Sequence, residues 1–130
     1  MTEITVTLPA GLWWTTNDLR GSHHKWDSKV RAVRELGKAA AILSRAELTP
    51  PVALHVFVGY PTAVRADPPN IAGTVSKHCV DGFVDAGLLP DDNSSVIVAT
   101  TYSREAKKSA RGTHTLRFVF TEQAIPWGVS

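Results

Sequence analysis

The sequence has one cysteine, no long apolar run and little net charge, and these absences exclude some classes of protein. The single cysteine, Cys79, excludes an internal disulfide and favours a reducing compartment. The first ten residues lack the basic and apolar regions of a secretory signal, and no apolar run approaches the roughly 20 residues that a membrane-spanning helix needs. We therefore expect a cytoplasmic protein without a membrane partner. The formal charge is only +2, so the placement of charges is more informative than their total.

The chain does have enough apolar residues for one core, because 43% of its 130 residues are hydrophobic. Alternating and β-branched runs predict strands at 3–8, 52–60, 95–102 and 114–121. Apolar residues three and four apart predict helices over 27–44 and from about 71 or 74 to 86, the second closed by Gly87 in the left-handed conformation. The run 52–60 is apolar on both faces, which predicts a central strand covered on both sides. The stretch 13–25 shows no clear period and is expected to be an ordered loop.

The order β-α-β-α-β-β predicts a fold of the α/β (α+β) class. We expect one compact domain over residues 1–130, with a mixed sheet of about four strands and two main helices packed on it. The chain contains no internal repeat or linker that would indicate a second domain.

Acidic residues are concentrated between residues 65 and 96, around the second predicted helix. Lys77 and Asp81 are four residues apart on the polar side of that helix, so a cation and a carboxylate share one row. Asp67 precedes the helix, and Asp91 and Asp92 follow it. Because Asp67 follows one strand and Asp92 precedes the next, we expect neighbouring strands to bring both to the same edge of the sheet.

Carboxylates gathered at one point repel each other unless a cation lies between them, and Mg²⁺ prefers oxygen ligands. Such a metal promotes phosphodiester hydrolysis by activating a water and neutralising a phosphate oxygen, while a nearby lysine stabilises the developing charge. We therefore expect a Mg²⁺ site, with Mn²⁺ as an alternative ion. The expected metal ligands, direct or through water, are Asp67, Asp81, Asp91 and Asp92, and the expected catalytic residues are Asp67, Asp81, Asp92 and Lys77.

The same segment resembles the RusA-like family of Holliday junction resolvases, in a phage-type variant. The matching residues are Asp67 and Asn70 in DPPN, Lys77 and Asp81 in KHCVD, the Ala86-Gly87 cap, and Asp91-Asp92 before a strand. The opening ITVTLP is also similar to the family's first strand. The resemblance implies a Mg²⁺-dependent endonuclease of DNA recombination and repair, in which a homodimer nicks symmetric strands of a four-way junction in a bacterial or phage-infected cell. It also implies a supporting role for Asn70.

The sequence departs from the family's DxDN signature in two ways. Pro69 replaces the second aspartate, and the gap between Asp67 and Lys77 is longer than the usual one. Either Asp81 or Asn70 would then supply the missing oxygen ligand. The departure leaves two alternatives open: a branched-DNA-binding dimer with weak or no catalysis, and a nuclease for other branched DNA such as flaps.

Basic residues outside this segment are expected to contact the phosphate backbone of branched DNA. The predicted DNA-binding residues are Arg20, Lys25, Arg65, Arg104, Lys107, Lys108 and Arg111. The last four lie in a loop whose one counter-charge is Glu105. The alternative interpretation is a solvated loop without a ligand.

Other patterns indicate structure more than chemistry. His23, His24, His78 and Cys79 match no standard zinc spacing. Cys79 falls on the apolar side of its helix, which favours an inert thiol over a nucleophile. Trp13 and Trp14 are more typical of packing or dimer contacts than of a base-stacking platform. Asp67, Asp91 and Asp92 also suit polar turns, and Asp85 suits a solvated helix face.

Overall fold

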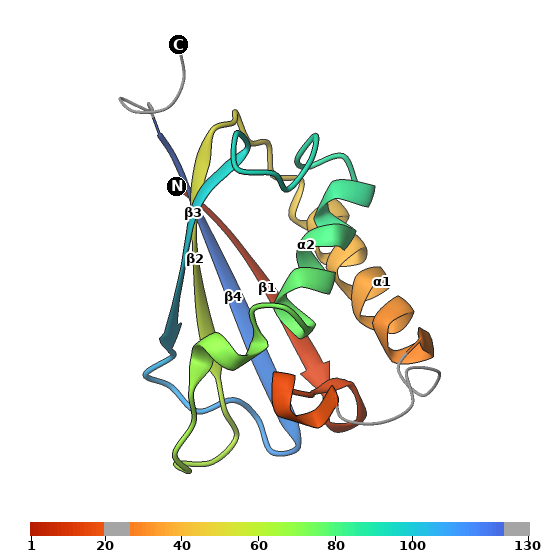
Figure 1. Ribbon diagram of the computed structural model, residues 1–130, viewed down its shortest axis with the longest axis vertical. Helices are drawn as coiled ribbons and strands as arrows, with labels where there is room; N and C mark the ends of the chain where they lie inside the picture. The colour runs from red at the N-terminus through yellow and green to blue at the C-terminus, as the bar shows by residue number, and fades with distance from the viewer. Residues whose placement is uncertain (20–26, 124–130) are drawn as a thin grey trace.

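A computed structural model, which describes residues 1–19 and 27–123, places four strands in one mixed sheet (Figure 1). The strands are β1 (Thr2–Pro9), β2 (Val52–Gly59), β3 (Ile97–Arg104) and β4 (Thr113–Glu122), in the spatial order β1-β4-β2-β3. β4 is antiparallel to both β1 and β2, whereas β2 and β3 are parallel. The helices are α1 (Asp27–Ser44) and α2 (Val75–Asp85). This arrangement confirms the predicted order β-α-β-α-β-β and the single α+β domain.

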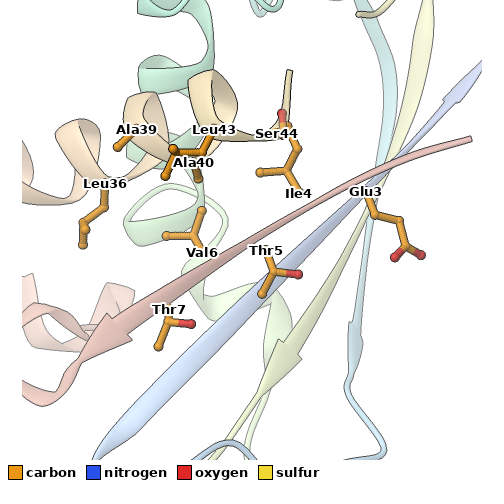
Figure 2. A pocket seen from close by; sticks show the side chains of 10 residues that line it. All are labelled: Glu3, Ile4, Thr5, Val6, Thr7, Leu36, Ala39, Ala40, Leu43 and Ser44. Carbon is orange, nitrogen blue, oxygen red and sulfur yellow. The ribbon is translucent and has the colours of Figure 1, made fainter. Parts of the chain in front are cut away.

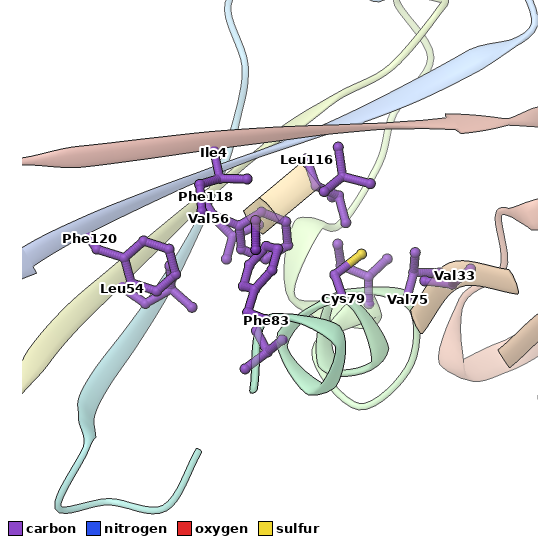
Figure 3. Close-up of a cluster of buried hydrophobic side chains, with 14 of the residues drawn as sticks. Ile4, Val33, Leu54, Val56, Val75, Cys79, Phe83, Leu116, Phe118 and Phe120 are labelled. Carbon is purple, nitrogen blue, oxygen red and sulfur yellow. The ribbon is translucent and has the colours of Figure 1, made fainter. Parts of the chain in front are cut away.

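Both helices lie on the same face of the sheet (Figure 1), and the core fills the space between. Residues of β1 alternate between buried and exposed, with Ile4, Val6 and Leu8 buried. Phe83 of α2 packs edge-on against Phe118 and Phe120 of β4, at ring-centroid distances of 4.8 and 6.0 Å (Figure 3). Every second side chain of β1 therefore points to the face of the sheet that packs on the helices, as expected for a half-buried strand.

The prediction that the second strand is covered on both sides was wrong. No helix covers the outer face of β2 within residues 1–19 and 27–123, and His55 and Phe57 on that face are half-buried. Phe57 packs between the His55 ring, at 4.0 Å, and the Arg117 guanidinium, at 4.2 Å. The apolar residue on the open face is thus covered by neighbours on the sheet itself, which a continuous apolar run cannot distinguish from burial under a second layer.

The two helices cross with their backbones in contact. A Cβ placed on Gly37 would lie 2.5 Å from the carbonyl oxygen of Cys79, and one on Gly82 would lie 2.2 Å from that of Arg34. Glycine at these two positions is therefore what allows α1 and α2 to pack so closely. Cys79 is fully buried at this crossing, and its burial raises the pKa of the thiol well above its usual range, in agreement with the expected inert cysteine.

The predicted boundaries differ from the observed ones by a few residues at most. α1 has the predicted bounds, and Gly87 has the expected positive φ, +83°. Short 3₁₀ helices at Ala10–Leu12, Thr16–Leu19 and Pro68–Ile71 replace parts of the predicted loops. Residues 20–25 of the predicted loop lie outside the described residues. In the described part of the chain, no helix combines the length and hydrophobicity needed to cross a lipid bilayer.

Candidate active site

Lys77 joins two carboxylates that come from different parts of the chain. Its Nζ donates to Oδ1 of Asp81, one turn further along α2, at 2.7 Å. It also donates to Oδ2 of Asp92, in the turn between α2 and β3. The side chains of Asp81 and Asp92 are 22% and 28% exposed, so both carboxylates are accessible from solvent. The structure thus gathers three of the four predicted catalytic residues into one group, here called the Lys77 cluster (Lys77, Asp81 and Asp92).

The charges of this cluster stabilise one another. Partial burial alone would lower the pKa of Lys77, but its hydrogen bonds with Asp81 and Asp92 raise that pKa above its ordinary value. The hydrogen bond from Lys77 lowers the pKa of Asp92, and partial burial opposes this shift. Lys77 is therefore a cation and Asp92 an anion at neutral pH.

Asp91 shapes the turn that presents Asp92. Its Oδ1 accepts from the backbone N–H of Asp92 at 2.7 Å, and its Oδ2 accepts from Nδ2 of Asn93 at 3.1 Å. Asn93 in turn accepts, through Oδ1, from the backbone N–H of Ser95 at 3.0 Å. Asp91 therefore has both of its carboxylate oxygens committed to the turn, which is a supporting position.

A cavity of about 150 Å³ adjoins the Lys77 cluster, between α2 and the edge strand β3. Lys77 and Asp92 line it together with three hydroxyl-bearing residues, Ser76, Thr100 and Tyr102. Its remaining lining is apolar and consists of Leu54, Ala72, Val80 and Ile97. The Ser76 and Tyr102 hydroxyls are 3.2 Å apart, and burial raises the pKa of Tyr102, so its hydroxyl stays protonated at neutral pH.

Sequence reasoning did not single out Ser76 or Tyr102. Ser76 is fully buried beside Lys77 on α2, a position typical of packing. Tyr102 faces the helices because it is paired with Val56 in the parallel register of β2 and β3. The sequence does not show this register, and without it one cannot tell which side chains of β3 face the Lys77 cluster.

Asp67 is placed differently from expectation. Because β2 and β3 are parallel, the end of β2 and the start of β3 lie at opposite ends of the sheet, and the expected reason for Asp67 to meet Asp92 was wrong. Asp67 is exposed and precedes the 3₁₀ helix Pro68–Ile71 without capping it through its side chain. It lies near Tyr60, whose pKa is raised by burial, lowered by Arg104 and raised by the Asp67 charge.

Asn70 anchors the same loop through its backbone. Its N–H donates to the Asp67 carbonyl oxygen at 3.0 Å, and its carbonyl oxygen accepts from Oγ1 of Thr16 at 2.7 Å. The second of these bonds ties the DPPN segment to the 3₁₀ helix Thr16–Leu19. Asn70 is half-buried.

The donor chemistry of the Lys77 cluster suits a magnesium ion. Mg²⁺ is usually bound by one or two carboxylates and keeps several waters or substrate oxygens as further ligands. Asp81 and Asp92 already share one cationic group and remain partly exposed. Within residues 1–19 and 27–123, no three Asp, Glu, His or Cys side chains are grouped to hold one ion, so the set is smaller than the four ligands predicted.

His78, whose spacing to the other histidines and to Cys79 predicted no zinc site, lies beside the cluster. Its Nδ1 is 3.7 Å from Oδ2 of Asp81, and its ring packs at a tilt against Trp14, at 6.1 Å between centroids. Burial lowers the pKa of His78, although Asp81 opposes this effect, so the imidazole is neutral at neutral pH. Trp14 is buried in the core, which confirms the packing role expected of it. Trp13 stacks on His114 with centroids 4.0 Å apart.

The predicted DNA-binding residues fall into three groups. Lys107 and Lys108 are exposed and line two surface hollows of about 400 and 250 Å³. Arg65 and Arg111 are also exposed. Arg20 and Lys25 lie outside the described residues.

Arg104 is largely engaged within the chain. Its guanidinium donates to the carbonyl oxygens of Val64 and Thr62, at 2.6 and 2.9 Å, and lies 4.7 Å from the centre of the Tyr60 ring. It therefore fixes the loop that leads to Asp67. Arg117, a cation that the sequence analysis did not single out, donates to Glu105 at 2.7 Å and to Glu3 at 3.0 Å on the open face of the sheet.

No family model matches the chain, and a comparison with curated proteins gives no match either. The functional conclusion therefore depends on the geometry of the Lys77 cluster and on the residue pattern from 65 to 96.

Proposed function

We propose that this protein is a Mg²⁺-dependent, structure-selective DNA endonuclease that resolves four-way junctions. The observation that carries the proposal is the Lys77 ammonium held between the carboxylates of Asp81 and Asp92, beside a cavity lined by hydroxyl groups. A lysine and two carboxylates are the groups needed to bind a divalent cation and to neutralise a reacting phosphate. The resemblance of DPPN, KHCVD and the Asp91-Asp92 pair to the RusA-like resolvases supports the same activity.

The residues have distinct roles in the proposed reaction. Asp81 and Asp92 would hold the metal, and Asp91 orders the turn that carries Asp92. Asp67, which the sequence predicts as a further ligand, lies outside the Lys77 cluster in the loop after β2. Mg²⁺ would supply a water of lowered pKa and would neutralise charge on the phosphate. Lys77 stabilises the negative charge that develops on the phosphorus oxygens as the phosphorane-like state forms. Tyr102 and Ser76 present hydroxyl donors on the wall beside it.

Substrate binding is proposed to depend on the basic surface. Lys107, Lys108 and Arg111 contact phosphates along the junction arms, and Arg104 acts mainly by fixing the loop before Asp67. Such contacts make binding weaken steeply with salt. We further propose a homodimer, which would place two sites on symmetric strands, in a reducing cytoplasmic setting that suits the single buried Cys79.

Cleavage of a labelled synthetic four-way junction tests the proposal. The wild-type chain is compared with Asp67→Asn and Asp81→Asn, in Mg²⁺, in Mn²⁺ and in EDTA, with a linear duplex of the same sequence as the control substrate. We expect paired nicks that are confined to the junction, absent in EDTA and lost in Asp81→Asn. Cleavage by folded Asp67→Asn at the wild-type rate would remove Asp67 from the site.

One observation favours a second candidate, a branched-DNA-binding protein without turnover. Pro69 stands where the second carboxylate of the signature would be, and within the described residues only two carboxylates share the Lys77 cation. A binder of this kind would hold the junction equally well in Mg²⁺ and EDTA and would give no product. The cleavage assay, run beside a gel-shift assay, distinguishes the two candidates. A flap substrate in the same assay identifies a nuclease with a different branched substrate.

A further inference from the structure

The open face of the sheet, which no helix covers within residues 1–19 and 27–123, carries a regular array of side chains. Glu3, Thr5 and Thr7 of β1 point to this face, whereas Ile4 and Val6 point toward α1 (Figure 2). Burial agrees with this alternation, because the first three are exposed and the other two are buried. The open face is therefore a surface of polar side chains that solvent or a ligand can reach.

The register continues this array across the two central strands. Thr5 is paired with Arg117 of β4, and Arg117 is paired with Phe57 of β2. Because paired residues point to the same face, these side chains all lie on the open face. The Phe57 ring is stacked on the His55 ring at 4.0 Å, and the Arg117 guanidinium lies over Phe57, 4.2 Å from its centre. Two rings and a guanidinium therefore form one column of planar groups.

The hydrogen-bond donors of Arg117 are largely used within the chain. Its Nε and Nη2 donate to the two carboxylate oxygens of Glu105, at 2.7 and 3.1 Å, and its Nη1 donates to Glu3 at 3.0 Å. Two carboxylates thus offset its charge, so Arg117 is poorly suited to bind a phosphate. Its side chain is still 31% exposed. Because one face of the guanidinium lies over Phe57, the opposite face is what remains for a ligand, and such faces stack on nucleobases.

Arg117 also lines a hollow of about 400 Å³ on the open face. Thr5 and Thr115 form its wall on the sheet, and residues of the segment 105–110 form the rest. These residues together are here called the Arg117 hollow. Its volume falls within the roughly 300–1,000 Å³ of pockets that bind small molecules or single groups of larger ones.

Two lysines make the rim of the Arg117 hollow positive. Lys107 and Lys108 are exposed and take part in no ion pair within the described part of the chain. Ser109, which follows them, donates through Oγ to the Thr113 carbonyl oxygen at 2.6 Å and through its N–H to that of Tyr60 at 3.0 Å, so the segment is held in place. The hollow thus offers ammonium groups for an anion beside a guanidinium face for a ring. A nucleotide combines both groups.

We propose that the Arg117 hollow binds an unpaired nucleotide of a single-stranded nucleic acid. The base stacks on the face of Arg117 that is turned away from Phe57 and so continues the column, while adjoining phosphates contact Lys107 and Lys108. The inference goes beyond the proposed nuclease activity, because no residue of the Lys77 cluster takes part. The cavity beside that cluster lies between α2 and β3, on the helix side of the sheet.

The open face favours a single strand over a duplex or a free nucleotide. In a duplex each base is stacked on both faces, so only an unpaired base offers a face to Arg117. Past His55, the open face continues with Ala53 and Thr121, which are paired with each other and have short side chains. A second nucleotide therefore meets no bulky group there, and a strand makes more contact than a free nucleotide does.

The first test measures binding of fluorescein-labelled single-stranded oligonucleotides, deoxyribo and ribo, by fluorescence anisotropy in EDTA. Thr5→Glu adds a carboxylate to the hollow and should weaken binding by about tenfold or more, because it repels the phosphates. Thr101→Glu is the matched control and should weaken binding by less than about threefold. Thr101 is also an exposed threonine of the open face, paired with His55, but it lies on the edge strand β3 and does not line the hollow.

Two results of this test would overturn the proposal at once: no binding of either oligonucleotide, or equal weakening by the two variants. A Thr5→Glu chain with a changed oligomeric state and unchanged affinity would also overturn it, since the hollow would then be an interface between copies. Because the assay measures binding without Mg²⁺, its outcome is independent of whether the Lys77 cluster cuts DNA.

The second test separates stacking from charge. Arg117→Lys keeps the positive charge but removes the planar group, so it should weaken oligonucleotide binding by about tenfold and leave inorganic polyphosphate, which has no bases, unaffected. Lys107→Ala should weaken the binding of both probes. Arg31→Lys, at an exposed arginine of α1, is the control and should change neither.

Equal weakening of both probes by Arg117→Lys, or no weakening of the oligonucleotide, would contradict stacking on the guanidinium. Competition by dAMP as strong as that by the oligonucleotide would contradict a strand as the ligand. Circular dichroism checks that each variant folds, and if Arg117→Lys does not fold, the comparison of Thr5→Glu with Thr101→Glu decides.

Discussion

Replacing Gly82 with alanine tests the close packing that positions the Lys77 cluster. Gly82 is the residue after Asp81, at the point where α2 contacts α1. An added Cβ would lie 2.2 Å from the Arg34 carbonyl oxygen and 2.6 Å from the Lys38 backbone nitrogen. Both are backbone atoms of a helix, so neither can rotate away as a side chain does. The helices must separate by about 1 Å to restore van der Waals contact.

The sign of the effect follows from two opposing contributions. In an exposed helix, Gly→Ala stabilises by about 1 kcal/mol through helix propensity. Forcing extra volume into a packed contact costs about 1–3 kcal/mol, and more where backbone atoms must move. Because the added Cβ would clash with backbone atoms of α1 and not with a side chain that can move, we expect a net loss of about 1–3 kcal/mol in unfolding free energy. This corresponds to a fall of about 5–15 °C in Tm for a domain of this size.

Urea and thermal unfolding, followed by circular dichroism, measure this loss. Gly11→Ala is the control, because a Cβ at Gly11 would meet no atom of residues 1–19 and 27–123 within 4 Å. It should change the unfolding free energy by no more than about 0.5 kcal/mol. A Gly82→Ala chain as stable as the wild type, or more stable, would refute the close contact of the two helix backbones.

Three further predictions follow from other parts of the molecule. Lys77→Met removes the cation between Asp81 and Asp92, so Mg²⁺ should bind more tightly in calorimetry, because the two carboxylates lose their competing charge. Single-turnover cleavage should nevertheless fall by about 10²-fold or more, because Lys77 no longer stabilises the reacting phosphate. Weaker Mg²⁺ binding together with slower cleavage would contradict the proposal that the carboxylates bind the metal and Lys77 acts on the phosphate. Burial lowers the pKa of His78 and of His114 from the usual 6.5, and Nδ1 of His114 is buried without a hydrogen-bond partner among the described residues. The unfolded chain therefore binds more protons, so unfolding free energy should fall as pH drops below about 6.5 in urea titrations, and a flat profile would count against this. Arg104→Gln frees two loop carbonyls and should speed proteolysis of the loop before Asp67, with a loss of about 1 kcal/mol in stability, whereas unchanged proteolysis would show that the loop is held by other contacts.

The sequence predicted most of the fold because local patterns determine it. α1 was predicted with its observed bounds, since its apolar residues recur every three to four positions and Pro50 and Pro51 follow it. The coverage of β2 was mispredicted because Phe57 is shielded by His55 of the same strand and by Arg117 of β4. The contact with Arg117 depends on strand pairing, which no local pattern contains.

The candidate site was predictable where its geometry is local. Lys77 and Asp81 are one helical turn apart, so their pairing follows from spacing alone. The link from Lys77 to Asp92 depends on the path of the turn after α2, and the position of Asp67 depends on the parallel pairing of β2 and β3. Tyr102 was missed for the same reason. The relative direction of two strands depends on the fold of the whole chain and not on local sequence. The predictions about Asp67 and Tyr102 failed because they required that direction.

Single-turnover cleavage of a four-way junction by Asp92→Asn, measured beside Asp85→Asn, tests the central claim most directly. Asp85 lies on the same helix as Lys77 but pairs with Arg34, with Nη2 to Oδ1 at 2.8 Å, outside the Lys77 cluster. In Mg²⁺ we expect Asp92→Asn to bind the junction yet cut it slower by about 10²-fold or more, while Asp85→Asn cuts at nearly the wild-type rate. Wild-type cleavage by folded Asp92→Asn would contradict a nuclease site at the Lys77 cluster, and so would the absence of any Mg²⁺-dependent product from the wild-type chain.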